Sequence, residues 1–220
     1  MRQTIAIDGP VSAGKSTIAK ALAQALGILY LDTGATYRAL ALKMVREGIA
    51  PQDTAQVEAA LSRTEVSVEQ AGRIQRTFLD GEEVSHLIRT PEISRMASKI
   101  SALRPVREKM VKLQRECAAR GDMVLDGRDI GTRVLPNATH KFFLVASAEV
   151  RAKRRYEELR ASGKPDTFEQ VLWDLTERDR QDYQREADPL RCAEDAIEID
   201  TTFLSIEEVV ARMLGYIRKS

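Results

Sequence analysis

Residues 4–27 read TIAIDGPVSAGKSTIAKALAQALG, and this stretch decides the fold class. Its first five residues form an apolar run that is typical of a short buried strand, and a glycine-rich turn follows at once. From Ser16 to Leu26 the apolar residues recur with helical spacing, and Gly27 is the expected stop of the helix. A buried strand that passes through such a turn into a helix is the opening unit of an α/β fold.

The turn between this strand and this helix carries a phosphate-binding motif. Residues 9–16, GPVSAGKS, match the pattern G-x-x-x-x-G-K-[ST] of the P-loop. Gly9 and Gly14 allow backbone N–H groups to turn inward around an anion, which the positive end of the helix dipole also favours. We expect Lys15 to reach the β- and γ-phosphates of ATP and Ser16 to hold Mg²⁺. The predicted ATP-binding residues of this loop are Gly9, Pro10, Val11, Ser12, Ala13, Gly14, Lys15, Ser16 and Thr17.

Further apolar runs predict the remaining strands of the core. Helical patterns separate these runs along the chain, and this alternation indicates an α/β architecture with a parallel sheet. The runs cover residues 28–31, 123–126, 141–145 and 197–200.

Residues 65–84 differ from this pattern. Apolar and polar residues alternate there, and turn signals occur at residues 70–72 and 80–81. We therefore expect a small antiparallel meander inserted into the α/β fold.

The sequence also marks the starts of several helices. Thr90 precedes a proline, which combines an N-cap residue with proline at the first helical position. Thr167 with Gln170, and Ser205 with Glu208, have the spacing of capping boxes, in which each side chain bonds the backbone N–H of the other residue.

The composition restricts the class of protein. The chain has 220 residues, of which 43% are hydrophobic, so it suits a single domain with a substantial core. Lysine and arginine total 34 against 33 aspartates and glutamates, giving a net charge of +1. This balance argues against broad binding to nucleic acid. Arginine dominates the basic residues, and its planar fork suits phosphate groups.

The cysteines and histidines do not indicate a metal site or a disulfide framework. Cys117 and Cys192 lie far apart without a CxxC motif, and His86 and His140 are isolated, so a structural or surface role is expected for each histidine. No apolar run approaches the roughly 20 residues of a membrane span, and the first residues lack a long apolar signal region. We expect a cytoplasmic protein with no membrane or nucleic-acid partner, and the charge balance favours a monomer.

Asp126 ends the apolar run at residues 123–126. P-loop proteins place a carboxylate at such a point toward the water shell of Mg²⁺, and this is the favoured interpretation. The alternative is an ordinary aspartate at a strand end that caps the turn before Gly127.

The motif alone does not distinguish a switch, a motor and a kinase. A GTPase switch needs N-K-x-D and D-x-x-G, and the chain contains neither. Motors and transport ATPases usually have larger domains, so a small-molecule kinase remains. Such an enzyme must bind a second anion, and arginines are the side chains suited to that task.

Three arginine-bearing segments meet this need. DGRDIG (residues 126–131) and DTGATYR (residues 32–38) follow predicted strands, where α/β sheets bind ligands. ERDRQDYQR (residues 177–185) lies in a helical stretch, and its spacing places Arg178, Asp182 and Arg185 on one face. For this last segment a solvated face with intrahelical ion pairs is the competing interpretation.

Taken in order, DGPVSAGKS, LDTGATYR, RPVRE, LDGRDIGT and ERDRQDYQR resemble the bacterial cytidylate kinases. The match runs from Thr4 to the C-terminal helix. It implies a P-loop nucleoside-monophosphate-kinase fold: a five-stranded parallel sheet with helices on both faces, a small antiparallel β insert in the acceptor-binding region and a short helical lid. The implied single domain 1–220 has a core at about 1–32, 99–150 and 187–220, an acceptor region at about 33–98 and a lid at about 151–186.

The resemblance also implies roles for individual residues. In the acceptor site, Thr33, Arg107 and Asp129 read cytosine, Ser98 and Asp182 contact the sugar with Arg178 nearby, and Arg38, Arg128 and Arg185 hold the phosphate. Tyr37 belongs to the same site, Arg154 is a lid residue near ATP, and the catalytic groups are Lys15, Arg38, Arg128 and Arg185. Thr33 stands where the family often has serine, which keeps the hydroxyl and adds a methyl group near the base.

The implied reaction is ATP with CMP or dCMP giving ADP with CDP or dCDP, with Mg²⁺ as cofactor. The exocyclic amine of cytosine needs an acceptor such as Asp129, whereas uracil presents a second acceptor there. Two alternatives remain from the residues. One is a kinase for UMP, AMP or a metabolite such as shikimate, and the other is a non-enzymatic ATP-binding regulator.

Overall fold

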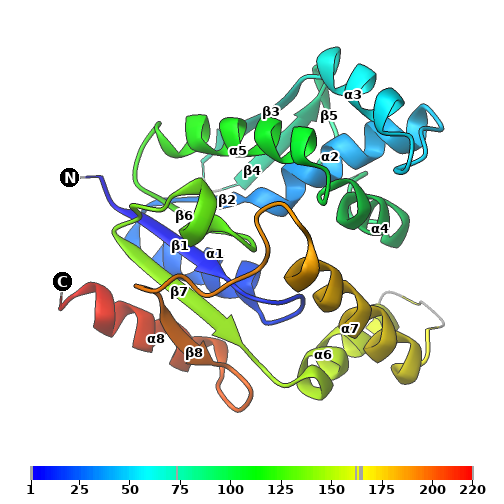
Figure 1. Cartoon of the computed structure of the whole chain (residues 1–220). Helices are drawn as coiled ribbons and strands as arrows, with labels where there is room; N and C mark the ends of the chain where they lie inside the picture. Colours follow the sequence, from blue (N-terminus) through cyan, green and yellow to red (C-terminus); the bar gives the residue numbers. More distant parts are fainter. Residues whose placement is uncertain (1, 73, 162, 164–165, 220) are drawn as a thin grey trace.

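A five-stranded parallel sheet forms the centre of the molecule (Figure 1). The computed structural model describes residues 2–72, 74–161, 163 and 166–219. The strands lie in the order β2-β6-β1-β7-β8, and every neighbouring pair is parallel. All five predicted strands are confirmed, with bounds that move by at most one residue. They are β1 (Thr4–Asp8), β2 (Leu29–Asp32), β6 (Met123–Asp126), β7 (His140–Val145) and β8 (Ile197–Asp200).

Helices cover both faces of this sheet, as expected. Successive side chains of a strand point to opposite faces. Ile5 and Ile7 pack with the helices on one face, whereas Ala6 packs with the helix on the other. The first face carries α1 (Lys15–Leu26) and α8 (Ile206–Ile217), and the second carries α5 (Arg104–Ala118). Burial on both sides explains why the strands are apolar almost throughout.

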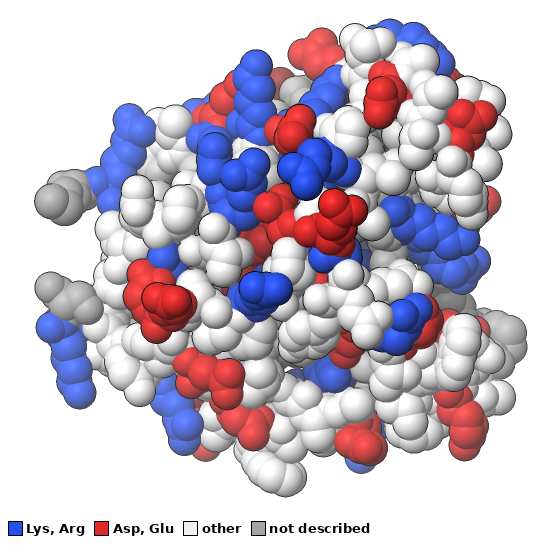
Figure 2. Space-filling model, in the orientation of Figure 1, with Lys and Arg blue, Asp and Glu red and all other residues white. Residues whose placement is uncertain are grey.

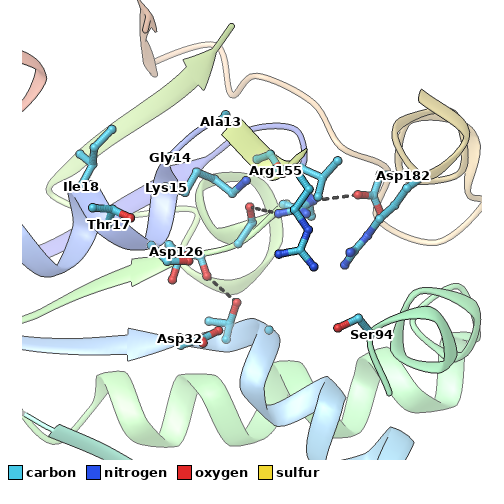
Figure 3. A pocket seen from close by; sticks show the side chains of 18 of the residues that line it. Ala13, Gly14, Lys15, Thr17, Ile18, Asp32, Ser94, Asp126, Arg155 and Asp182 are labelled. Atoms are coloured by element: carbon cyan, nitrogen blue, oxygen red, sulfur yellow. Dashed lines mark hydrogen bonds and ion pairs between the residues drawn. The ribbon is translucent and has the colours of Figure 1, made fainter. Parts of the chain in front are cut away.

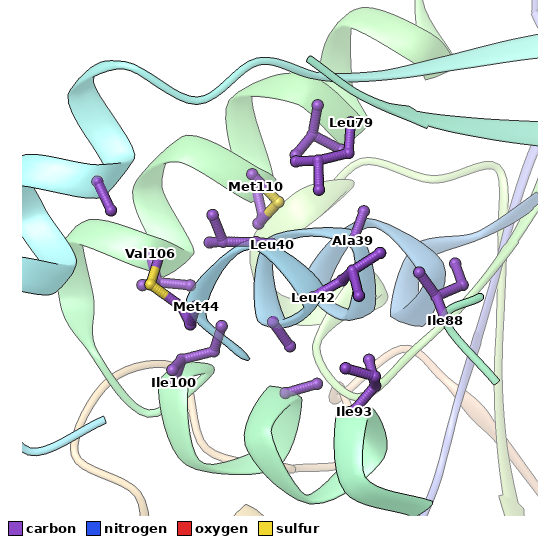
Figure 4. Packing of buried hydrophobic residues seen from close by; sticks show 14 of the residues in the cluster. Ala39, Leu40, Leu42, Met44, Leu79, Ile88, Ile93, Ile100, Val106 and Met110 are labelled. Atoms are coloured by element: carbon purple, nitrogen blue, oxygen red, sulfur yellow. The ribbon is translucent and has the colours of Figure 1, made fainter. Parts of the chain in front are cut away.

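A second apolar cluster lies between α2, α4 and α5 (Figure 4). Leu40 and Met44 of α2 are fully buried there with Ile100 of α4 and Met110 of α5, and Leu79 joins them from a three-stranded antiparallel sheet. That sheet confirms the predicted meander. The elements of this region are α2 (Thr33–Arg46), α3 (Thr54–Ser62), β3 (Val66–Ala71), β4 (Ile74–Leu79), β5 (Glu82–Glu83) and α4 (Pro91–Ile100).

The helices α6 (Ala148–Ala161) and α7 (Phe168–Gln184) form a pair at one end of the sheet (Figure 1). They have a small apolar cluster of their own, built from Ala152, Leu159, Val171 and Leu175. Val11 of the phosphate-binding loop packs against this cluster. The helix pair is therefore in direct contact with the phosphate-binding loop.

The helix starts follow the sequence signals with one exception. Thr90 caps α4, and Ser205 with Glu208 forms a complete capping box at α8. At α7, the Thr167 hydroxyl accepts the N–H of Gln170, but the Gln170 side chain donates to Asp174 at 2.9 Å. The second half of the expected box is therefore wrong, because a carboxylate one turn along the helix is the stronger acceptor.

Charged side chains of both signs are interspersed over the face drawn in Figure 2. This matches the near-zero net charge of the chain. Among the described residues, no helix combines the length and the apolar character needed to cross a membrane.

Candidate active site

A cleft of about 820 Å³ opens at the carboxyl edge of the parallel sheet. It is lined by the loop after β1, by the start of α2 after β2 and by residues 126–129 at the end of β6. This is the edge at which open α/β sheets bind ligands. Figure 3 shows Lys15, Asp126 and Asp182 around the cleft.

The phosphate-binding loop depends on its glycines. Gly9 has φ of 147°, and a Cβ there would lie 2.1 Å from the Leu144 carbonyl oxygen, so only glycine lets the loop pack against β7. Gly14 has φ of 86° and directly precedes α1, so the N-terminus of that helix faces the cleft. The loop and the dipole of α1 together form the anion-binding geometry that the motif predicts.

Lys15 is 6% exposed and lines the cleft. Its Nζ donates to the carbonyl oxygen of Pro10 at 2.5 Å. Burial lowers the pKa of Lys15, and Arg128 lowers it further, whereas Asp126 opposes both. The ammonium group is thus held across the loop, close to where phosphates would lie.

Asp126 is joined to the loop by a direct hydrogen bond. Its Oδ2 accepts the hydroxyl of Ser16 at 2.7 Å, and its Oδ1 accepts the hydroxyl of Tyr30 at 2.8 Å. Burial raises the pKa of Asp126, and the nearby carboxylate of Asp32 raises it further. The alternative was that Asp126 caps the turn before Gly127. The N–H of Gly127 instead donates to the carbonyl oxygen of Ile7.

The other half of the cleft contains arginines paired with carboxylates. Nε of Arg128 donates to Asp182 at 2.7 Å, and a terminal nitrogen of Arg38 donates to Asp32 at 2.7 Å. An acceptor phosphate would enter this half by competing with carboxylates that already balance the positive charges. The site is therefore rich in arginine without a large uncompensated charge.

Arg107 is the most buried member of this set, with 2% of its side chain exposed. One terminal nitrogen contacts Asp129, and its Nε donates to Asp188 at 2.8 Å. Burial lowers the pKa of Arg107, but Asp129 and its other partners outweigh this effect and raise it. These two carboxylates hold the Arg107 side chain in one orientation.

Arg178 differs from its neighbours in its lack of a carboxylate partner, because among the described residues no carboxylate lies within ion-pair distance of it. Its Nε, like that of Arg38, is buried without a hydrogen-bond partner. Burial lowers the pKa of Arg178 to about 10, with Arg128 adding to the effect. The group is still charged at neutral pH, so a cation without a carboxylate partner among the described residues lines the cleft, and an anion bound there would be favoured.

The cleft brings together nearly all the residues predicted from the sequence. The exceptions are Gly9 and Pro10, which belong to the phosphate-binding loop but do not line the cleft. The predicted residues that line it are Val11, Ser12, Ala13, Gly14, Lys15, Ser16, Thr17, Thr33, Tyr37, Arg38, Ser98, Arg107, Asp126, Arg128, Asp129, Arg154, Arg178, Asp182 and Arg185.

Two predicted residues have surroundings that the sequence did not indicate. Arg185 lies just past α7 with extended backbone, yet it remains 3.7 Å from Asp182. Its side chain is 5% exposed, so it lines the cleft as a nearly buried group and does not belong to a solvated helical face. Arg154 donates to the carbonyl oxygen of Thr201 at 2.6 Å, which places it beside the loop after β8.

Three carboxylates of the site were not predicted. Asp32 caps α2 through Ala35 and pairs with Arg38, and its position before a helix start was a usable signal. Asp188 has φ of 48° and holds Arg107. Asp8 accepts the N–H groups of Ile130 and Gly131 at 2.8 and 2.7 Å. No local sequence pattern indicates these roles of Asp188 and Asp8.

Asp8 leads to a prediction about pH. Burial raises the pKa of Asp8 to about 7, although its two backbone hydrogen bonds oppose the shift. An aspartate with a raised pKa stabilises the fold below its unfolded value near 3.8, and this contribution is lost as pH rises through about 7. The stability advantage of the wild type over Asp8→Asn should therefore shrink between pH 4 and 8 in urea unfolding experiments. If the stability advantage of the wild type instead grows with pH, the hydrogen bonds from the N–H groups of Ile130 and Gly131 outweigh the effect of burial on the Asp8 pKa.

Comparisons with known proteins agree with this geometry. The family model described as cytidylate kinase matches residues 5–219. A cytidylate kinase of Caldicellulosiruptor bescii is 50% identical over 96% of this chain and 93% of its own length. One of Halalkalibacterium halodurans is 46% identical over 99% and 98%. An uncharacterised protein structure from Eubacterium ventriosum has a TM-score of 0.54 at 12% identity, covers 100% of both chains and supports the fold alone. The chain belongs to the cytidylate kinase family.

Proposed function

We propose that this chain transfers the γ-phosphoryl group of ATP to CMP or dCMP, giving ADP with CDP or dCDP, in pyrimidine nucleotide metabolism. The observation that carries the proposal is one cleft in which the phosphate-binding loop faces Arg178, whose Nε is buried without a hydrogen-bond partner. A donor triphosphate and an acceptor monophosphate need these two anion sites side by side. The names of the relatives supply the base.

The loop at residues 9–16 is the donor site in this proposal. Lys15 and the backbone N–H groups bind the phosphates, and Arg154 closes over the nucleotide from the lid. Ser16 and Asp126 fit Mg²⁺, because a hydroxyl and a carboxylate are the hard oxygen donors it prefers. When bound, Mg²⁺ neutralises charge on the β- and γ-phosphates. The described residues offer no cluster of three or more acidic, cysteine or histidine ligands.

Arg38, Arg128 and Arg185 bind the acceptor phosphate, and Arg178 is a further cation of the same cleft, near the sugar. The acceptor oxygen is already ionised, so no general base is needed. These cations screen the two anions from one another while the loop aligns them. Lid closure over residues 151–186 excludes water and limits hydrolysis of ATP.

Thr33, Arg107 and Asp129 recognise cytosine. The Thr33 hydroxyl donates to the carbonyl oxygen of Asp126 at 2.6 Å, so its lone pairs face outward as acceptors for the exocyclic amine. Arg107 donates to the base, and its contact with Asp129 orients both side chains. Tyr37 packs beside Arg107, with the guanidinium carbon 5.8 Å from the ring centre.

Ser98 and Asp182 contact the sugar. Asp182 is buried, and burial alone would raise its pKa, but Arg128, Arg178 and Arg185 outweigh this effect and lower it. The carboxylate is therefore ionised at neutral pH and able to accept sugar hydroxyls while it holds Arg128.

Removing Asp182 should impair acceptor binding more than donor binding. We expect Asp182→Ala to raise the KM for CMP roughly tenfold or more, the effect of losing a charged hydrogen bond, with the KM for ATP little changed. Steady-state kinetics with each substrate varied in turn measure both values. Asp174→Ala is the matched control, because Asp174 is exposed on the same helix. An equal rise in the KM for ATP would make Asp182 a structural partner of Arg128 only.

The test of the proposed function is an ATP-coupled assay with CMP, dCMP, UMP and AMP as acceptors. We expect turnover with CMP or dCMP and at least about tenfold lower kcat/KM with UMP and AMP, because an unpaired buried polar group disfavours the wrong base by roughly 1–3 kcal/mol. Preference for UMP or AMP would assign a different kinase activity. ATP binding without acceptor-dependent turnover would indicate a regulator.

A further inference from the structure

We propose that a buried ion pair in the lid helices, Arg151 of α6 and Asp179 of α7, fixes the peptide of Val11 in the phosphate-binding loop and so sets the affinity for the donor nucleotide. Neither side chain lines the cleft. They are therefore positioning residues, and the inference rests on the proposed binding of ATP by this loop.

The pair holds Val11 from both sides of its backbone. The N–H of Val11 donates to Oδ1 of Asp179 at 3.1 Å, and a terminal nitrogen of Arg151 donates to the Val11 carbonyl oxygen at 3.0 Å. The same nitrogen lies 2.5 Å from Oδ2 of Asp179, and Nε of Arg151 donates to the Ala146 carbonyl oxygen at 2.9 Å. Arg151 and Asp179 are 6% and 8% exposed, so water competes little for these bonds.

Apolar packing adds a third attachment. The Val11 side chain packs against the cluster between α6 and α7, which includes Leu175 and Tyr156. The next residue, Ser12, has φ of 58°, a conformation that a non-glycine residue keeps only when its surroundings hold it. Val11 is thus an anchor that attaches the phosphate-binding loop to α6 and α7. Its N–H donates to Asp179 and does not point to the phosphate site.

The anchor also joins the two substrate sites. Asp179 follows Arg178 in α7, and Asp182 is one turn further, and both of these neighbours line the cleft. The helix that presents acceptor-binding groups is therefore hydrogen-bonded to the donor loop through Asp179. A shift of α7 would therefore move the backbone of Val11 through Asp179 as well as through the apolar contact.

Charge and geometry predict opposite effects of removing Asp179. A carboxylate beside a triphosphate repels it, so on charge alone the loss of Asp179 would strengthen ATP binding. If Asp179 acts by holding Val11, its loss weakens ATP binding. The sign of the change in the KM for ATP separates the two.

The experiment compares Asp179→Ala and Asp179→Asn with wild type and with Asp174→Ala, an exposed aspartate on the same helix. We expect Asp179→Ala to raise the KM for ATP about tenfold, the size of one lost charge-assisted hydrogen bond, with less than a twofold change in the KM for CMP. Asp179→Asn should show a smaller rise, because the amide oxygen can still accept the Val11 N–H but the amide cannot balance Arg151. Asp174→Ala should match wild type.

An unchanged or lower KM for ATP in the asparagine variant, which keeps the shape of aspartate, overturns the inference even if the alanine variant fails to fold. Equal rises in both KM values also overturn it, since they indicate general loss of structure. Lys15→Ala serves as the reference. If Lys15→Ala retains activity, the proposed donor site itself fails. If Lys15→Ala is inactive while both Asp179 variants bind ATP normally, the donor site stands and only the proposed role of the Arg151–Asp179 pair is wrong.

Discussion

Lys15→Ala should lower kcat by roughly 10²–10³, the effect of losing one preorganised charge aimed at the transferring group. The Nζ of Lys15 donates to the Pro10 carbonyl oxygen, which holds the side chain across the phosphate-binding loop. Lysine is the only cation of the phosphate-binding motif, so no other side chain of the loop can replace its charge. The variant should therefore remain folded and bind CMP, yet transfer almost no phosphate.

Single-turnover assays at saturating ATP and CMP measure this loss, and circular dichroism checks the fold. Lys15→Met is a useful second variant, because it keeps most of the apolar stem that occupies a 6% exposed position. Lys112→Ala is the control for loss of a charge, since Lys112 is exposed on α5 and does not line the cleft. A folded Lys15→Ala protein with more than half of wild-type activity would rule out the role of the loop.

The parts of the fold that were predictable are those with local causes. A buried strand needs only an apolar run, and the loop at residues 9–16 needs glycines where its backbone turns, so both were legible in the sequence. The meander at residues 65–84 follows from alternation and from turn residues at 80–81, and Asp80 and Gly81 indeed have positive φ. The parallel order of the strands followed from the helices between them.

The charge pairing inside the site was not predictable, because its partners are distant in sequence. Arg107 meets Asp188 across 81 residues, and Asp8 meets Gly131 across 123. No periodicity relates such positions, and their contact exists only after the sheet and α7 are in place. The sequence therefore indicated which cations surround the acceptor but not which carboxylates balance them. This explains why the sequence did not indicate that the Arg185 side chain lies nearly buried beside Asp129 and Asp182.

Arg185 provides the sharpest test of the acceptor site. Its Nε donates to the carbonyl oxygen of Asp188 at 2.7 Å, and a terminal nitrogen lies 3.5 Å from Asp129. The other terminal nitrogen lies 3.7 Å from Asp182, so an acceptor phosphate would compete with these carboxylates for the guanidinium. Arg185→Lys keeps the charge but loses the planar fork, so we expect kcat/KM for CMP to fall by about 1.5–3 kcal/mol. Arg185→Met should lose more, because two phosphate groups must then approach with less compensation.

Burial of Arg185 adds an effect on stability that an exposed arginine would not have. With 5% of the side chain exposed, its removal leaves the Asp188 carbonyl and Asp129 short of a donor, which should lower the free energy of unfolding by about 1–3 kcal/mol. Kinetics must therefore be measured well below the melting temperature of each variant. Arg180→Lys and Arg180→Met are the matched controls, because Arg180 is 57% exposed on the same helix and pairs with Glu177. They should show wild-type kinetics and stability changes within about 0.5 kcal/mol. If Arg185→Met loses stability but phosphorylates CMP as well as the Arg180 variants do, Arg185 supports the wall of the cleft and does not hold the acceptor phosphate.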